Sequence, residues 1–156
     1  MSAPSADAPR MIAQNKRARY EFHVLEEKEC GVALSGTEVK SLRAGRCSIA
    51  EAYAYARGGE LWLVNAHIPE YAQGNVHNHP PLRERKLLLH RRELDQWAAA
   101  VKQKGVTIVP LAIYFKGSRA KVAIALCKGK KLYDKRADKR EKDDRREMDR
   151  AMSRRR

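Results

Sequence analysis

Basic side chains beside aromatic rings are the residues of this chain best suited to chemistry with a partner molecule. Lys16, Arg17 and Arg19 stand directly before Tyr20, so three cations lie close to one ring in the sequence. Cations neutralise phosphates, and an aromatic ring can stack on an unpaired base. The pattern favours contact with a nucleic acid; the alternative is the solvated start of a strand.

A second basic run covers residues 83–86 and leads into Leu87, Leu88, Leu89 and His90. Neither a helix nor a strand hides three consecutive side chains on one face, so we expect one of the leucines to face outward. His90 suits either an RNA contact or a cap of the helix that follows. The sequence does not separate these two roles.

Catalytic chemistry has less support in this sequence. His77 and His79 have i, i+2 spacing on an expected loop, without a third ligand of the usual kind nearby. The GxSxG, HExxH and GxxxxGK[ST] motifs do not occur in the chain. We therefore predict no catalytic residue, no metal site and no cofactor. An RNA-processing or RNA-modifying enzyme and a structural ribosomal protein remain the alternative functions.

The last 29 residues, 128–156, form a basic tail. They carry a net charge of +7, and their only sizeable apolar side chains are Leu132, Tyr133, Met148 and Met152. Such a segment cannot bury enough apolar surface to offset the entropy of ordering itself. We expect it to be disordered when free and helical when a polyanion, most simply RNA, holds it. A disordered solubility tail is the alternative.

Residues 1–127 also carry a net charge of +7, and the sequence pI is about 10.0, as is typical of nucleic-acid-binding proteins. The three cysteines form no CxxC pair, which argues against a disulfide frame or a zinc knuckle, and we expect Cys30 and Cys127 in the core. We find no apolar signal region at the N-terminus and no stretch near the ~20 apolar residues that span a bilayer. These features predict a cytoplasmic protein with no membrane contact.

The first half of the chain has mainly strand-like patterns. Residues 1–13 are rich in Ala, Pro and Ser and predict a disordered leader. Tyr20, Phe22 and Val24 alternate as in a half-buried strand. Residues 35–37 can cap a short helix over 38–43. Residues 52–64 predict a β-hairpin around two glycines, and residues 71–85 predict a long loop.

The second half predicts one clear helix and two strands. Within residues 84–104, apolar side chains at i, i+3, i+4 and i+7 predict a helix that ends at Gly105. Residues 106–115 and 120–126 predict strands joined by a four-residue turn. Pro110 must then sit at an edge or a bulge, because it has no N–H to donate.

Most of the predicted elements are strands. Adjacent hairpins favour an antiparallel sheet, which can remove its open edges by closing into a barrel. We predict a mainly β fold: a small OB-like antiparallel β-barrel with two or three flanking helices and a basic, conditionally helical C-terminal tail. The domain organisation is a leader over 1–13, an OB-like RNA-binding body over 14–127 and the tail over 128–156. A ferredoxin-like sandwich is the alternative fold.

Four motifs, in order, resemble those of one family. They are residues 15–19 (NKRAR), residues 36–45 (GTEVKSLRAG), residues 85–90 (RKLLLH) and residues 128–131 (KGKK) followed by residues 134–136 (DKR). These strings are similar to those of the SsrA-binding protein, or small protein B, family over nearly the whole chain from Met11. The motif around Glu38 resembles the family's fold signature, with Glu38 and Lys40 expected on the surface.

The resemblance implies an RNA-binding adaptor of trans-translation rather than an enzyme. Such a protein binds the tRNA-like domain of transfer-messenger RNA (tmRNA, or SsrA RNA) and delivers it to stalled, non-stop ribosomes. Its tail occupies the empty mRNA channel of the small subunit near the decoding centre. We expect a monomer whose partners are tmRNA and the ribosome.

The resemblance also implies roles for individual residues. In the body, Glu29, Leu88 and His90 match tmRNA-contacting positions, while Tyr133 matches a tail position that stacks on a decoding-centre base. The full set expected to bind RNA in the body is Lys16, Arg17, Arg19, Glu29, Arg85, Lys86, Leu88 and His90. The set expected to contact the ribosome is Lys128, Gly129, Lys130, Lys131, Tyr133, Asp134, Lys135, Arg136 and Met152.

Overall fold

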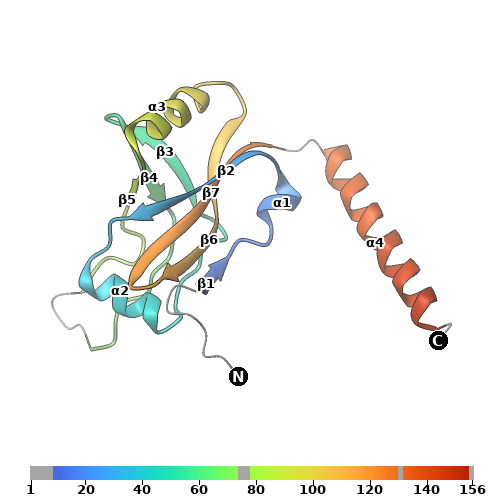
Figure 1. The fold of residues 1–156 in the computed structure, drawn as a ribbon, viewed down its shortest axis with the longest axis horizontal. Coiled ribbons are helices and arrows are strands. Elements are labelled where there is room, and N and C mark those ends of the chain that lie inside the picture. Colours follow the sequence, from blue (N-terminus) through green and yellow to red (C-terminus); the bar gives the residue numbers. More distant parts are fainter. Residues whose placement is uncertain (1–8, 74–77, 130–131, 155–156) are drawn as a thin grey trace.

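The computed structural model describes residues 9–73, 78–129 and 132–154, which form one strand-rich body and a separate C-terminal helix (Figure 1). In chain order the elements are β1 (Arg10–Gln14), α1 (Ala18–Glu21), β2 (Phe22–Val32), α2 (Gly36–Arg43), β3 (Tyr53–Arg57), β4 (Glu60–Val64), β5 (Arg85–Leu88), α3 (Arg91–Ala100), β6 (Val106–Lys116), β7 (Arg119–Gly129) and α4 (Leu132–Arg154).

The strands pair antiparallel in the order β6-β3-β4-β5-β2-β7, and β7 pairs back onto β6. The sheet therefore bends into a ring, which leaves few strand edges open. The ring is not quite a barrel, because β3 and β6 are joined by one residue pair, Ala54 with Ile108. Beside that junction, β1 pairs with β6 over residues 112–115. The predicted mainly β, antiparallel architecture with few helices is confirmed.

The longest ladders belong to β7, which pairs with both β2 and β6. The β6–β7 register shifts between Pro110 and Ala112, so the predicted bulge at Pro110 is confirmed. A second shift lies between Val24 and Glu26 in the β2–β7 ladder. These bulges bend the long strands and let a few strands curve around one core.

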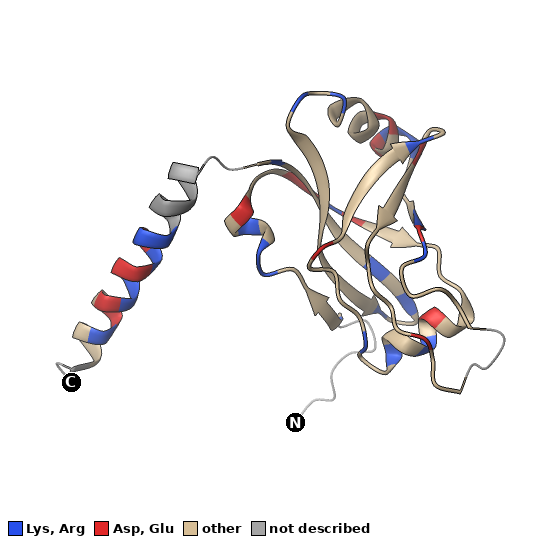
Figure 2. Ribbon diagram, turned by 180° about the vertical axis from the view of Figure 1, so that it is seen from behind, with Lys and Arg blue, Asp and Glu red and all other residues tan. Residues whose placement is uncertain are grey.

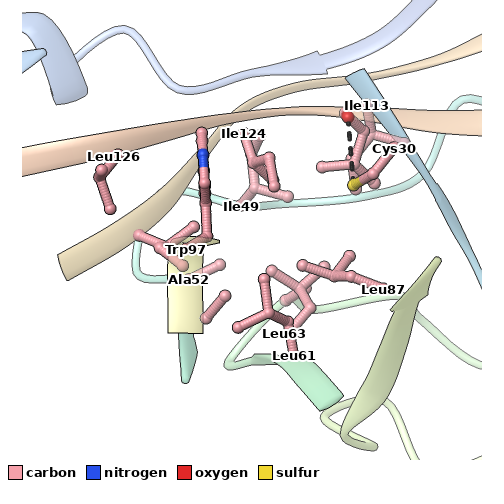
Figure 3. Packing of buried hydrophobic residues seen from close by; sticks show 14 of the residues in the cluster. Cys30, Ile49, Ala52, Leu61, Leu63, Leu87, Trp97, Ile113, Ile124 and Leu126 are labelled. Atoms are coloured by element: carbon pink, nitrogen blue, oxygen red, sulfur yellow. Dashed lines mark hydrogen bonds between the residues drawn. The ribbon is translucent and has the colours of Figure 1, made fainter. Parts of the chain in front are cut away.

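The core fills the inside of the ring (Figure 3). In β4, Leu61 and Leu63 are fully buried while Trp62 between them is half-buried, as the two-residue period of a strand requires. Leu94 and Trp97 are the buried side chains of α3 and close one end of the core.

The two cysteines expected in the core, Cys30 and Cys127, are buried free thiols, as predicted. Burial raises the pKa of Cys30 to about 12 and that of Cys127 to about 11. Both thiols therefore stay protonated near neutral pH and act as small apolar side chains.

Near the N-terminus the sequence prediction is wrong in two places. Residues 10–13 belong to β1 rather than to a leader, because their backbone completes the free edge of β6. Tyr20 lies in the short helix α1, which is fixed by Ala18, a residue buried against Val109, Ala125 and Cys127. Residues 1–8 lie outside the described residues.

The predicted helix over 84–104 is shorter than expected, because its first part is the strand β5. Leu87 is fully buried and pairs with Leu61 of β4 and with Val32 of β2. The backbone N–H and C=O groups of residues 85–88 therefore find partners in two neighbouring strands. A helix over these residues would lose both ladders. The apolar spacing of Leu94 and Trp97 holds only from Arg91 onward.

The helix α4 leaves the body after β7 and extends away from the ring (Figure 1). All side chains of residues 139–153 are exposed, including Met148 and Met152. Arg145 donates to Glu141 at 3.1 Å, which confirms the predicted i, i+4 pair. None of the helices in the described parts of the chain has the length and apolar character needed to cross a membrane.

Candidate nucleic-acid interface

One outer face of the ring brings together residues from β2, β5 and β7. Gly31 of β2 pairs with Leu88 of β5 on one side and with Lys121 of β7 on the other. Paired residues point to the same side of a sheet, and so does Glu29, two positions before Gly31. Leu88 is 50% exposed although Leu87 is fully buried. The predicted outward-facing leucine is therefore Leu88, and it shares a face with Glu29.

The Glu29 carboxylate is held by two side chains of β6. The Tyr114 hydroxyl donates to its Oε2, and Lys116 Nζ lies 3.4 Å from its Oε1. The hydrogen bond from Tyr114, with help from Lys116, lowers the pKa of Glu29. Burial and the bond to Glu29 raise the pKa of Tyr114. Glu29 thus stays ionised on the surface, where it can accept hydrogen bonds from a base or a ribose hydroxyl.

His90 lies two residues beyond Leu88, at the N-cap position of α3. Its backbone carbonyl accepts from the Leu94 N–H at 2.9 Å, but its side chain makes no capping hydrogen bond. The residue is exposed. The sequence left two roles open for His90, an RNA contact and a helix cap. In this structure its side chain does not cap α3.

Arg85 corrects the predicted set, because it is fully buried and cannot reach RNA. Its Nε donates to Glu38 Oε2, and its Nη1 donates to the Ala66 carbonyl at 2.7 Å. Two carbonyls and one carboxylate therefore surround the guanidinium, since Nη2 also donates to the Pro81 carbonyl at 3.2 Å. Arg85 joins α2, β5 and the loop after β4 inside the body.

Glu38 is fully buried too, so the expectation that it faces the surface is wrong. Burial by itself raises the pKa of this carboxyl, but hydrogen bonds from Arg83, the Ser35 N–H and Arg85 outweigh burial and lower the pKa to about 2. Ser35 and Glu38 also form the capping box of α2. Lys40 is exposed as expected, with its Nζ 5.5 Å from the centre of the Tyr71 ring.

Lys86, the other basic residue of β5, faces outward. It is partly exposed, and its Nζ lies 3.8 Å from Glu60 Oε1. It is paired with Trp62 across the β4–β5 ladder. Its position on the outer side is compatible with the predicted RNA contact.

The N-terminal basic motif lies elsewhere on the body. Lys16, Arg17 and Arg19 are exposed around α1, and Arg19 forms an ion pair with Glu27. This region adjoins the start of β2, roughly 20 Å along the strand from Glu29. The first residues of β2, Phe22 and His23, pair with residues 129 and 128 at the end of β7. The structure therefore places this motif beside the base of the tail, away from Leu88.

The expected ribosome-contacting residues follow from that point. Lys128 and Gly129 are the exposed end of β7, while Lys130 and Lys131 lie outside the described residues. Met152 is 69% exposed on α4. The remaining positions, Tyr133, Asp134, Lys135 and Arg136, fall in the first turns of α4. Figure 2 shows basic and acidic residues interspersed along the later turns of this helix.

Arg119 and Lys121 are two cations of the Leu88 face that the sequence reasoning missed. They stand at alternate positions of β7 and lie on either side of Ala120. The alternation of charged and apolar residues at the start of this strand was a visible signal for an exposed face. Whether these cations lie beside Leu88 depends on the register of β7 with Gly31 of β2. The sequence of one strand does not give that register.

Comparison with known proteins decides the family. A model of the family described as "SmpB protein" matches residues 12–154. The chain belongs to the SmpB family. The SsrA-binding protein of Kineococcus radiotolerans is 53% identical over 152 residues, which cover 97% of each chain. That of Streptomyces coelicolor is 56% identical over 144 residues, covering 92% of this chain and 91% of the relative.

A solved structure supports the same assignment. It is described as "tmRNA-SmpB: a journey to the center of the bacterial ribosome" and contains a chain 48% identical to this one. The TM-score is 0.64, and the match covers 76% of this chain and 84% of that chain. The resemblance to this family that the four sequence motifs indicated is confirmed.

Proposed function

We propose that this protein binds tmRNA (SsrA RNA) and brings it to stalled ribosomes in trans-translation. It acts as a binding adaptor and not as an enzyme. The observation that carries the proposal is the SmpB family match over residues 12–154, together with a shared outer face for Glu29 and Leu88. The two regions of the molecule then have different partners.

The body binds the tRNA-like part of the RNA. Leu88 offers an exposed apolar surface, the Glu29 carboxylate accepts hydrogen bonds, and the His90 ring can donate or accept according to its tautomer. Unpaired bases are recognised by such a mixture of packing and hydrogen bonding on their edges. Lys86 supplies a cation for a phosphate beside them.

The tail binds the ribosome. In this proposal α4 forms fully when it enters the empty mRNA channel of the small subunit, with Tyr133, residues 134–136 and Met152 near the decoding centre. Support comes from its side chains, which are exposed throughout residues 139–153, and from the Glu141–Arg145 ion pair, which lies within the helix. An ion pair of this kind adds about 0.2–0.5 kcal/mol, so the helix depends on a partner for stability.

The basic motif of Lys16, Arg17 and Arg19 lies next to Lys128, where the tail begins. We assign this motif to RNA at the junction of body and tail, so that it serves both partners. The ring of strands is then a member of the oligonucleotide-binding (OB) type of barrel. The organisation proposed is a leader before Arg10, a body that ends near Cys127 and a tail from Lys128. The protein works as a monomer in the cytoplasm.

Deletion of residues 133–156 tests the division of labour. The shortened protein should bind the tRNA-like domain of tmRNA with the affinity of the full chain, because Glu29, Leu88 and His90 remain in place. It should fail to support peptide tagging on ribosomes stalled without a stop codon. A large loss of tmRNA affinity on this deletion would contradict the separation of the two surfaces.

A further inference from the structure

We propose that the groove beside Leu88 receives an unpaired nucleobase of the bound RNA, while Arg119 and Lys121 hold the adjoining phosphates. This inference rests on the proposed function, since it takes the RNA bound by the Leu88 face as the occupant. It adds to the proposed binding face Gly31, Arg119 and Lys121, which lie outside the motifs that identified the family.

The groove exists because Gly31 has no side chain. Gly31 lies directly between Leu88 and Lys121 in the ladder, and all three face outward. A Cβ at position 31 would lie 3.3 Å from Leu88 Cβ and 3.4 Å from Leu88 Cδ1. Any larger residue would fill the space between the two neighbours. Here the glycine therefore provides room rather than an unusual backbone angle.

The walls of the groove suit a flat, mostly apolar group. Its volume is about 480 Å³, and Val32, Leu34 and Val39 line it together with Leu88. These side chains come from β2, from the segment after it and from α2. The hydrogen bonds of the buried Glu38 hold α2 to the body. Enzymes and other proteins that accept an unstacked base hold it between aromatic or apolar side chains in the same way.

Charge favours a polynucleotide over a neutral ligand. Arg119 and Lys121 line the groove. Within the described parts of the chain neither lies in an ion pair, since the nearby Glu29 is paired with Lys116, although the charge of Lys121 helps to lower the pKa of Glu29. The neighbouring face of β3, β4 and β5 differs, because Arg57 lies 3.2 Å from Glu84 and Lys86 lies 3.8 Å from Glu60. Cations that are not engaged in an ion pair can neutralise phosphates without first giving up a partner. The groove is also continuous with the proposed contact at Leu88.

The test measures binding of full-length protein to the tRNA-like domain of tmRNA at several salt concentrations. Gly31→Val fills the groove without changing charge, so affinity should fall about tenfold or more, the loss expected for one stacked base, with an unchanged salt slope. The double variant Arg119→Gln/Lys121→Gln should make the slope of log K against log salt shallower by about 1.4–1.8.

Lys104→Gln is the matched control. Lys104 is exposed on the loop after α3, at the opposite end of the body from α2 (Figure 1). It should keep the affinity of the unaltered protein. Gly31→Ala, which only crowds Leu88, and Val39→Phe replace Gly31→Val if that variant does not fold.

The outcomes separate this inference from the proposed function. If the unaltered protein and Lys104→Gln bind the RNA but every folded groove variant binds equally well, the nucleobase site is wrong and the proposed function stands. If the double variant alone is impaired, phosphates lie on these cations but no base enters the groove, which also overturns the proposal. If the unaltered protein does not bind this RNA, the proposed function itself fails.

Discussion

The outer face of the body and the tail helix carry similar kinds of side chain but hold them in opposite ways. On the body, Glu29 and Leu88 are fixed by ladders that join three strands, and Tyr114 orients the carboxylate from a fourth. On α4 the side chains of residues 139–153 are exposed, and Arg145 bonds to Glu141 of the same helix. The first surface is organised by contacts between strands, whereas for the second we propose that the partner supplies most of the stability of the helix.

This difference matters because residues 1–127 and 128–156 have the same net charge of +7. Net charge gives attraction to a polyanion but no geometry. On the body, two of the cations, Arg119 and Lys121, line a groove of defined shape beside Leu88. In the tail, the charged residues are distributed along a helix, and a helix can follow an extended channel of RNA.

The largest expected effect is on the rigidity of the body. Glu38→Gln leaves the Arg85 guanidinium buried without its charged partner, so the free energy of unfolding should fall by about 3–5 kcal/mol. Urea denaturation followed by tryptophan fluorescence measures this loss, since Trp97 is in the core. Asp95→Asn is the control, because its exposed ion pair with Arg91 should contribute no more than about 0.5 kcal/mol. Equal effects of the two variants would show that the buried network does not support the body.

The buried network also marks the limit of what the sequence could predict. The hairpin of β3 and β4, the two long strands β6 and β7 and the bulge at Pro110 follow from local patterns, and all were predictable. The ion pair of Glu38 with Arg85 was not, because the two residues are 47 positions apart and each looks like a surface residue by itself. Their burial follows only from the tertiary structure, in which Arg85 joins Glu38 of α2 to the loop after β4.

The candidate site also has one part that the sequence could predict and another that it could not. The rule that neither a strand nor a helix hides three consecutive side chains predicted that one of residues 87–89 faces outward, and the family resemblance pointed to Glu29, Leu88 and His90. The placing of Arg119 and Lys121 beside Leu88 required the register of three strands around Gly31. The position of the N-terminal basic motif beside the base of the tail likewise depended on the β2–β7 ladder. Long-range register, rather than residue type, was the missing information.

A pair of adjacent leucines separates stability from binding. Leu87→Ala opens a cavity in the core and should reduce the free energy of unfolding by about 2–5 kcal/mol. Leu88→Ala should change it by about 0.5 kcal/mol or less, because the side chain is half exposed, but should weaken binding to the tRNA-like RNA. Denaturation and RNA titration on both variants provide the measurement. Strong binding by Leu88→Ala would remove that residue from the proposed interface.

Acid should weaken the body through the protonation of Glu38. The folded-state pKa of Glu38 is lowered from 4.5 to about 2, so its contribution to stability is complete above pH 4.5 and decreases as the pH falls toward 2. Glu38→Gln removes this titration, and the stability difference between the two proteins should shrink over that range. Urea midpoints at pH 6, 4 and 3 test the prediction. A constant difference would mean that Glu38 titrates alike in the folded and unfolded chains.

The smallest effect concerns the helix of the tail. Glu141→Gln removes the charge pair with Arg145, which should reduce helix stability by about 0.2–0.5 kcal/mol. Circular dichroism of the isolated 128–156 peptide measures the loss, and added salt should reduce the difference from the unaltered peptide because it screens exposed charges. Ser153→Ala leaves that pair intact and is the control. If the peptide were already fully helical and insensitive to both changes, the contrast between a preformed body surface and a partner-dependent tail would not hold.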